Sequence, residues 1–196
     1  MYSSPPFKMG LEALYNVNKR RFKCILKARS IFRNKCYNLI YMLNEGGISV
    51  EYKLLVEDDL IKCTETFIEV FNDEPWNDKW TFTQAKKYLS DFYHTPGFLG
   101  ILAVENEEIL GCILGVNKAW WSGDEYFVNE MFVKQQKQNK GIGKALLNYL
   151  IKELDTLNIS NITLLTDRGI PAEEFYKNNG FEEIKRIVFL HKNIKS

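Results

Sequence analysis

The sequence predicts a single domain of the α/β class, and two observations carry this prediction. Segments with the apolar pattern of strands alternate along the chain with segments that have the apolar period of amphipathic helices. The chain has 196 residues, of which 45% are hydrophobic, and this is enough for one α/β domain with a full core. The sequence contains no internal repeat and no sign of a second domain.

The elements are expected in the order β-α-α-β-β-β-α-β-α-β-β. A first strand alternates over residues 50–56, and Asp58 or Asp59 can cap the helix that follows it. Pro171 suits the first turn of the last helix, and Gly180 suits its C-terminal end. The strands are predicted at residues 50–56, 98–104, 109–116, 126–133, 161–166, 181–184 and 186–191, and the helices at 60–71, 83–93, 144–157 and 171–179.

The most informative segment, residues 138–145, lies between an apolar strand and an amphipathic helix. The first amides of a helix have no intrahelical partner and carry a partial positive charge, so they bind anions. Gly141 and Gly143 have no Cβ and let a phosphate approach the backbone, while Lys140 and Lys144 add positive charge. We therefore expect a phosphate or pyrophosphate here, and the alternative is an ordinary helix start with a glycine turn.

The spacing excludes two common phosphate-binding motifs. The phosphate loop of nucleotide hydrolases needs Ser or Thr after its lysine, and here Ala145 follows Lys144. The dinucleotide fingerprint needs three glycines and an acidic ribose-binding residue after them, and this turn has only two glycines. What remains is Gln-x-x-Gly-x-Gly after a strand.

This pattern resembles the acetyl-CoA pyrophosphate loop of the GNAT superfamily, the Gcn5-related N-acetyltransferases. A second segment, Ala172 to Phe181, reads Ala-x-x-Phe-Tyr-x-x-x-Gly-Phe and is similar to the family helix that flanks the CoA thiol arm. The two motifs stand in the family's order, and the resemblance covers roughly residues 50–192. It departs at Gly169, where many members carry Asn, which puts one side-chain contact to the CoA arm in doubt.

The resemblance implies a mixed, strongly twisted sheet and acetyl-CoA as co-substrate. It places backbone amides of the turn on the pyrophosphate, and backbone groups at the end of the preceding strand beside the pantetheine arm, where one amide polarises the thioester carbonyl. The implied cofactor residues are Gln138, Asn139, Lys140, Gly141, Ile142, Gly143 and Lys144 in the turn, and Met131, Phe132 and Val133 in the strand.

Two residues are candidates for proton transfer. Tyr176 stands where many family members place the tyrosine that protonates the leaving thiolate, and its alternative role is packing between helix and sheet. Glu130 is our candidate general base, because a carboxylate within an apolar strand is costly unless it is solvated or functional. The alternatives for Glu130 are a substrate ligand or an outward-facing residue. Simple alternation puts Asn129 on the opposite face from Glu130.

The acceptor is expected to be a small cationic amine. Tryptophans and acids occur together in residues 74–80 and 120–125, and this combination suits a cationic, partly apolar ligand. The predicted substrate-binding residues are Glu74, Trp76, Trp80, Trp121 and Glu130, although the tryptophans could instead anchor their loops. The pattern resembles small-molecule acetyltransferases, including aminoglycoside-6′-type relatives. A protein acetyltransferase and a non-catalytic CoA-binding sensor are the competing readings.

Residues 1–49 differ in charge from the rest of the chain. They hold nine Lys or Arg against two acidic residues, whereas residues 50–196 hold 17 basic and 23 acidic residues. A basic arm, a transit peptide and a translated leader ahead of a true start near Val50 are the three interpretations, and we favour the last. We expect the functional domain at 50–196, and its excess of acids favours amines over nucleic acid.

Several other classes of protein are disfavoured by the composition. The four cysteines have no Cys-x-x-Cys spacing and there are only two histidines, so no metal site is expected. The free thiols fit a reducing cytoplasm, and no apolar run reaches the length of a membrane span. Dimers are frequent among GNAT proteins, so a homodimer is one expected assembly.

Overall fold

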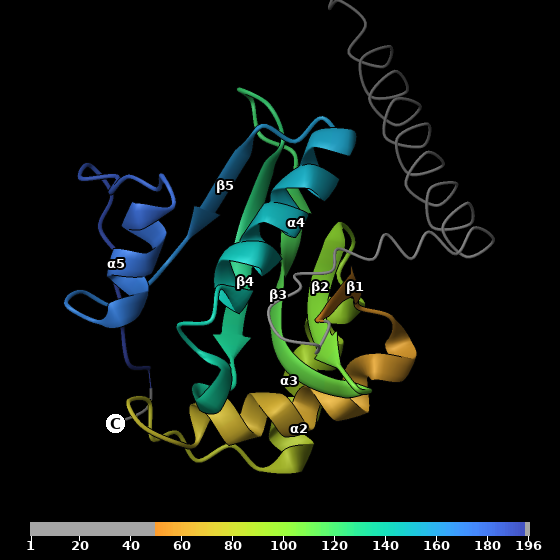
Figure 1. The fold of residues 1–196 in the computed structure, drawn as a ribbon. Helices are drawn as coiled ribbons and strands as arrows, with labels where there is room; N and C mark the ends of the chain where they lie inside the picture. The colour runs from red at the N-terminus through yellow and green to blue at the C-terminus, as the bar shows by residue number, and fades with distance from the viewer. Residues whose placement is uncertain (1–49, 195–196) are drawn as a thin grey trace, which may run out of the picture.

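The structure is a computed structural model, and it describes residues 50–194. Five strands form one sheet in the order β1-β2-β3-β4-β5 (Figure 1). The first four strands pair antiparallel, whereas β5 pairs parallel to β4, so the sheet is mixed. The elements are β1 (Glu51–Leu54), α2 (Leu60–Phe71), α3 (Phe82–Tyr93), β2 (Phe98–Glu105), β3 (Glu108–Lys118), β4 (Glu125–Val133), α4 (Ile142–Thr156), β5 (Asn161–Leu164) and α5 (Pro171–Asn178), with short 3-10 turns η1 (Glu57–Asp59) and η2 (Gln135–Lys137).

Helices cover both faces of the sheet. On one face, which we call the α4 face, Leu146 and Leu150 of α4 join a buried cluster with Tyr126 of β4. On the other, the α3 face, Phe67 of α2 and Leu89 of α3 join a cluster with strand residues of β2, β3 and β4. The amphipathic patterns of these helices therefore reflect two separate apolar contacts with one sheet.

The fourth strand contains a β-bulge at Asn129. Leu114 of β3 pairs with Glu130, and the next residue, Gly115, pairs with Val128, which leaves Asn129 without a partner on β3. A Cβ added at Gly115 would lie 2.1 Å from a backbone oxygen of β4. The glycine therefore allows the close approach of the two backbones next to the bulge.

The bulge reverses the alternation of side chains along β4. Tyr126 and Val128 belong to the α4 face, whereas Phe132, at the same parity, belongs to the α3 face. Glu130 also lies on the α3 face, where it meets α3. Simple alternation counted from the start of the strand would place Glu130 in the α4 core. Because the bulge interrupts the alternation at Asn129, our prediction that Asn129 and Glu130 lie on opposite faces of the sheet does not hold.

The last strand, β5, accompanies only the first half of β4. Its four residues pair with Glu125 to Val128, and from Asn129 to Val133 β4 pairs with β3 alone. Figure 1 shows β5 running away from β4 toward α5. The second half of β4 therefore has one edge that no strand of the described chain covers.

The elements from the first strand to the last helix match the predicted order, with ends that differ by a few residues. The two predicted C-terminal strands, 181–184 and 186–191, are wrong, because these residues form no strand. Phe181 is held against Tyr176, but the apolar side chains of Val188, Phe189 and Leu190 are 73–84% exposed. Strand-forming residues make a strand only where a partner edge pairs with them. The predicted leader, 1–49, lies outside the described residues.

Candidate active site

The predicted phosphate turn has the backbone that an anion site needs. Gly141 is the N-cap of α4 and has φ +79°, in the left-handed region that favours glycine. A Cβ added at Gly141 would meet no atom within 4 Å, so the space beside it is open. Asn139 also has a positive φ, of 58°. The chain thus turns sharply before Ile142 and presents the first amides of α4 at an exposed turn.

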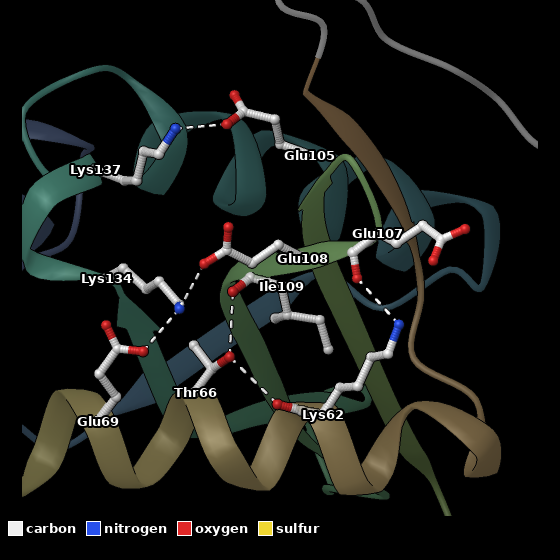
Figure 2. Close-up of polar contacts among 9 residues, drawn as sticks. All are labelled: Lys62, Thr66, Glu69, Glu105, Glu107, Glu108, Ile109, Lys134 and Lys137. Carbon is white, nitrogen blue, oxygen red and sulfur yellow. Dashed lines mark hydrogen bonds and ion pairs between the residues drawn. The ribbon is translucent and has the colours of Figure 1, made fainter.

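Two lysines just before the phosphate turn form ion pairs with acidic residues of neighbouring elements (Figure 2). Lys134 bridges Glu69 of α2 and Glu108 of β3, with both N–O distances 2.7 Å, and Lys137 pairs with Glu105 at 2.5 Å. The side-chain Nε2 of Gln138 donates to the backbone carbonyl oxygen of Val133 at 3.0 Å, which ties the turn back to β4.

Two further lysines of the turn have no such partners. Within residues 50–194, neither Lys140 nor Lys144 forms an ion pair, and both side chains are exposed. Their charge therefore remains available to an anion. Together with the open space at Gly141, this arrangement fits the pyrophosphate of CoA.

The predicted pantetheine segment, Met131 to Val133, lies on the open edge of β4. An extended ligand can pair with such an edge as an added strand. At the bulge, the side-chain oxygen of Asn129 is buried without a hydrogen-bond partner. A buried acceptor of this kind is costly unless a donor reaches it, and an amide N–H of the ligand arm is one suitable donor.

Glu130 has the environment of a general base. The phenol of Tyr88, on α3, donates a hydrogen bond of 2.5 Å to its Oε1. Burial raises the pKa of Glu130, the Tyr88 hydrogen bond lowers it, and the charge of Asp78 raises it, so that the pKa lies at about 7. A carboxyl group with this pKa accepts and releases protons efficiently near neutral pH.

Tyr176, on α5, lies in the same part of the molecule. Burial raises the pKa of its phenol to about 12, and the charge on Glu130 contributes to that rise. The phenol therefore keeps its proton at neutral pH. Its ring packs against Phe175 and Phe181, so the packing role and the proton-donating role are both open to it.

The α2–α3 loop carries three of the predicted substrate-binding residues, Glu74, Trp76 and Trp80. Asn72 closes the loop by exchanging two hydrogen bonds with the backbone of Trp80, at 2.8 and 2.9 Å. Glu74 and Trp76 line a hollow of about 30 Å³ that Gln138 of the phosphate turn also lines. Trp80 lines an open hollow of about 330 Å³, and its indole N–H donates to Asp78 at 3.0 Å.

Trp121 is not brought to this site. It lies in the β3–β4 turn and is 90% exposed, and a Cβ at nearby Gly123 would contact Ser160, just after α4. This turn precedes the first residue of β4, whereas Glu130 is five residues further along the strand. At about 3.4 Å a residue, roughly 17 Å separates the two positions.

Two residues that affect Glu130 could not be assigned a role from the sequence. Tyr88 was one of several aromatic residues in a predicted helix, and only the register between α3 and β4 shows that it meets Glu130. Asp78 was included among the acids of the loop without a role, and it is the residue whose charge raises the pKa of Glu130. The sequence signal for Asp78 was Trp80, two residues later. A partly buried indole N–H usually has an acceptor, and Asp78 is that acceptor.

Two negative findings apply to the described part of the chain. Residues 50–194 contain no group of three or more His, Cys, Asp or Glu side chains placed to hold a metal ion. None of the helices there combines the length and the apolar character that crossing a bilayer would require.

Comparison with known proteins identifies the family. Residues 57–181 match the model of the acetyltransferase (GNAT) family. An integron cassette protein from the mobile metagenome of V. cholerae is 24% identical with a TM-score of 0.64, and the alignment covers 75% of this chain and 94% of that one. An aminoglycoside acetyltransferase from an uncultured soil metagenomic sample is 22% identical, with a TM-score of 0.57 and coverage of 76% and 99%.

An aminoglycoside N-acetyltransferase solved with CoA has a TM-score of 0.62 at 13% identity, and the alignment covers 76% of this chain and 99% of that one. At these identities the structural matches show a shared fold. The family model carries the assignment, because it spans β2 to β5, the phosphate turn and α5. The chain therefore belongs to the GNAT family and is an N-acetyltransferase.

Proposed function

We propose that this protein transfers the acetyl group of acetyl-CoA directly to a primary amine of a small cationic molecule. The observation that carries the proposal is Glu130, a largely buried carboxylate with a pKa of about 7 that lies where the edge of β4 opens. GNAT acetyltransferases use acetyl-CoA, and the phosphate turn, the free lysines and the open edge all suit that co-substrate. The buried free thiols of Cys63 and Cys112 suit a reducing compartment, so we expect the protein in the cytoplasm.

The proposed reaction needs two proton transfers by residues of the chain. Glu130 takes a proton from the incoming ammonium, which frees the nitrogen lone pair to attack the thioester carbon. The N–C bond forms and the C–S bond breaks. Tyr176 gives its proton to the departing thiolate and regains one from the new amide nitrogen, and Glu130 releases its proton to solvent. Binding both reactants side by side supplies the orientation that the transfer requires.

The proposed acceptor is an amine with more than one positive charge, as in polyamines or aminoglycosides. Asp78 and Glu74 stand at the α2–α3 loop beside Trp76 and Trp80, and carboxylates with aromatic faces favour cations. Some structural relatives are aminoglycoside acetyltransferases, which supports this class of acceptor. Trp121 contributes to acceptor binding only if the acceptor is long enough to reach the β3–β4 turn.

The first experiment is calorimetric titration of the full chain with acetyl-CoA, followed by an assay of CoA release with a panel of polyamines, aminoglycosides and lysine peptides. We expect binding in the micromolar range and turnover with one of the small amines. Turnover with peptides alone would replace the acceptor class with a protein substrate. Binding without turnover on any amine would favour a CoA-binding sensor, and absence of binding would remove the proposal.

A further inference from the structure

The hydrogen bond between α3 and β4 gives Glu130 a fixed geometry. Tyr88 reaches only Oε1 of the carboxylate, at 2.5 Å. A phenol that donates to one oxygen restricts the rotation of the carboxyl group and leaves the second oxygen, Oε2, with its lone pairs available.

The ring of Tyr88 is itself held on three sides. Its centroid lies 5.1 Å from that of Trp80, 4.8 Å from that of Phe92 and 5.9 Å from that of Phe67. The helix that carries it begins with a capping box between Thr81 and Gln84 and buries Ala85 and Leu89 against the sheet.

The position of the Tyr88 hydroxyl is therefore determined by packing that does not involve Glu130. The donor stays in place whether the carboxyl group is protonated or not. Preorganised donors of this kind cost little reorganisation when charge develops on their acceptor.

The other charged or titratable groups near Glu130 come from three further elements. They are Asp78 of the α2–α3 loop, Cys112 of β3 and Tyr176 of α5. Burial and Asp78 both disfavour the charged form of Glu130, and Tyr88 is the neighbour that favours it.

We infer that Tyr88 is a positioning residue of the acetyltransferase: its hydroxyl fixes Oε1 of Glu130, leaves Oε2 as the atom that accepts the proton, and extends the activity of the base toward lower pH. This inference rests on the proposed role of Glu130 as the base. The hydrogen bond favours the ionised carboxylate, so without it Glu130 would hold its proton to a higher pH.

The test is Tyr88→Phe in the full chain, with Tyr93→Phe as the matched control on the same helix. The Tyr93 ring packs on Phe98 and His94 and makes no contact with Glu130. The Glu130 pKa is measured by NMR titration of ¹³C-labelled glutamate carboxyl groups, assigned with Glu130→Gln. The pH dependence of kcat/KM is measured in parallel.

In Tyr88→Phe we expect the Glu130 pKa to rise by about one, which is the scale of a hydrogen bond to a charged group. The acidic limb of kcat/KM should move by the same amount, while the KM for acetyl-CoA stays within twofold. Tyr93→Phe should change neither. A Glu130 pKa equal to that of the wild type in Tyr88→Phe would overturn the inference.

A second variant that keeps the hydroxyl and the shape of the ring provides a test if Tyr88→Phe does not fold. Replacement of Tyr88 by 3-fluorotyrosine makes the phenol a stronger donor, so the Glu130 pKa should fall, and an unchanged value would again overturn the inference. The NMR measurement does not depend on turnover. A shifted pKa in a protein that acetylates no amine would contradict the proposed function, whereas an unshifted pKa in an active enzyme would overturn the role of Tyr88 alone.

Discussion

The two halves of β4 differ in their pairing and in the face of the sheet on which their side chains lie. From Glu125 to Val128 the strand pairs on both edges, and Tyr126 is fully buried against α4. From Asn129 to Val133 it pairs on one edge, and Glu130 turns to α3. The first half holds the domain together, and the second half carries the proposed chemistry. The difference shows that one strand can serve stability and function when a bulge separates the two.

The largest effect is expected from Glu130→Gln, in the second half. Loss of a general base reduces rates by about 10²–10⁴-fold, so kcat/KM should fall by that factor while acetyl-CoA still binds. Glu125→Gln, in the first half of the same strand, is the matched control and should retain activity within twofold. Equal losses in both variants would erase the distinction between the halves.

The same substitution should increase stability at high pH. The pKa of Glu130 is raised by folding to about 7, so the wild type loses stability as the pH rises from the ordinary value of a glutamate through 7. Glu130→Gln removes that loss, and the gain at pH 8 is at most about 3 kcal/mol. Thermal melts at pH 4 and pH 8 test the sign: the variant should melt higher than the wild type only at pH 8.

Tyr126→Phe probes the first half. The Tyr126 phenol donates to the carbonyl oxygen of Leu99 at 2.6 Å, and the side chain is fully buried. Loss of this hydrogen bond should lower the free energy of unfolding by about 1–2 kcal/mol, measured by urea denaturation. The kcat/KM of the folded variant should change less than threefold. A large loss of activity without a loss of stability would show that the two halves are coupled.

Gly141→Ala tests the turn that follows the second half. The added methyl group meets no atom, so the cost comes from the positive φ alone and should be about 1 kcal/mol. Acetyl-CoA binding, measured by calorimetry, should weaken because the turn relaxes. Gly143→Ala offers a contrast, because its backbone is ordinary and its methyl group would lie 3.3 Å from the Met131 side chain.

Lys144→Ala should give the smallest effect. An exposed charge contributes about 0.5–1 kcal/mol, so the Kd for acetyl-CoA should rise two- to fivefold in low salt. The difference from the wild type should shrink in high salt because of screening. Lys152→Ala, near the other end of α4, is the control and should leave the Kd unchanged.

The backbone of the proposed phosphate turn could be predicted from the sequence because that segment is local. Gly141, Gly143 and the two lysines lie within five residues, and the backbone of a helix start follows from them. Glu130 could also be selected as a candidate, because a charge inside an apolar strand is visible without knowing the fold. The general order of elements up to α5 followed from hydrophobic periodicity.

The partner of Glu130 could not be predicted in the same way. Tyr88 and Glu130 are 42 residues apart, and their contact depends on the bulge at Asn129, which no single residue type announces. The two C-terminal strands failed for a related reason. Their residues have the composition of strands, but pairing is a property of the edge they would join, and that edge cannot be read from the segment itself.

The bulge also makes one residue of β4 dispensable to the pairing of the sheet. Leu114 and Gly115 are neighbours on β3, and Asn129 is the single residue that separates their partners Glu130 and Val128. Deletion of Asn129 would therefore join Val128 directly to Glu130, restore a regular ladder and leave the later side chains of the strand on their present faces. The extra residue therefore serves the local geometry beside Glu130 and not the pairing of the sheet.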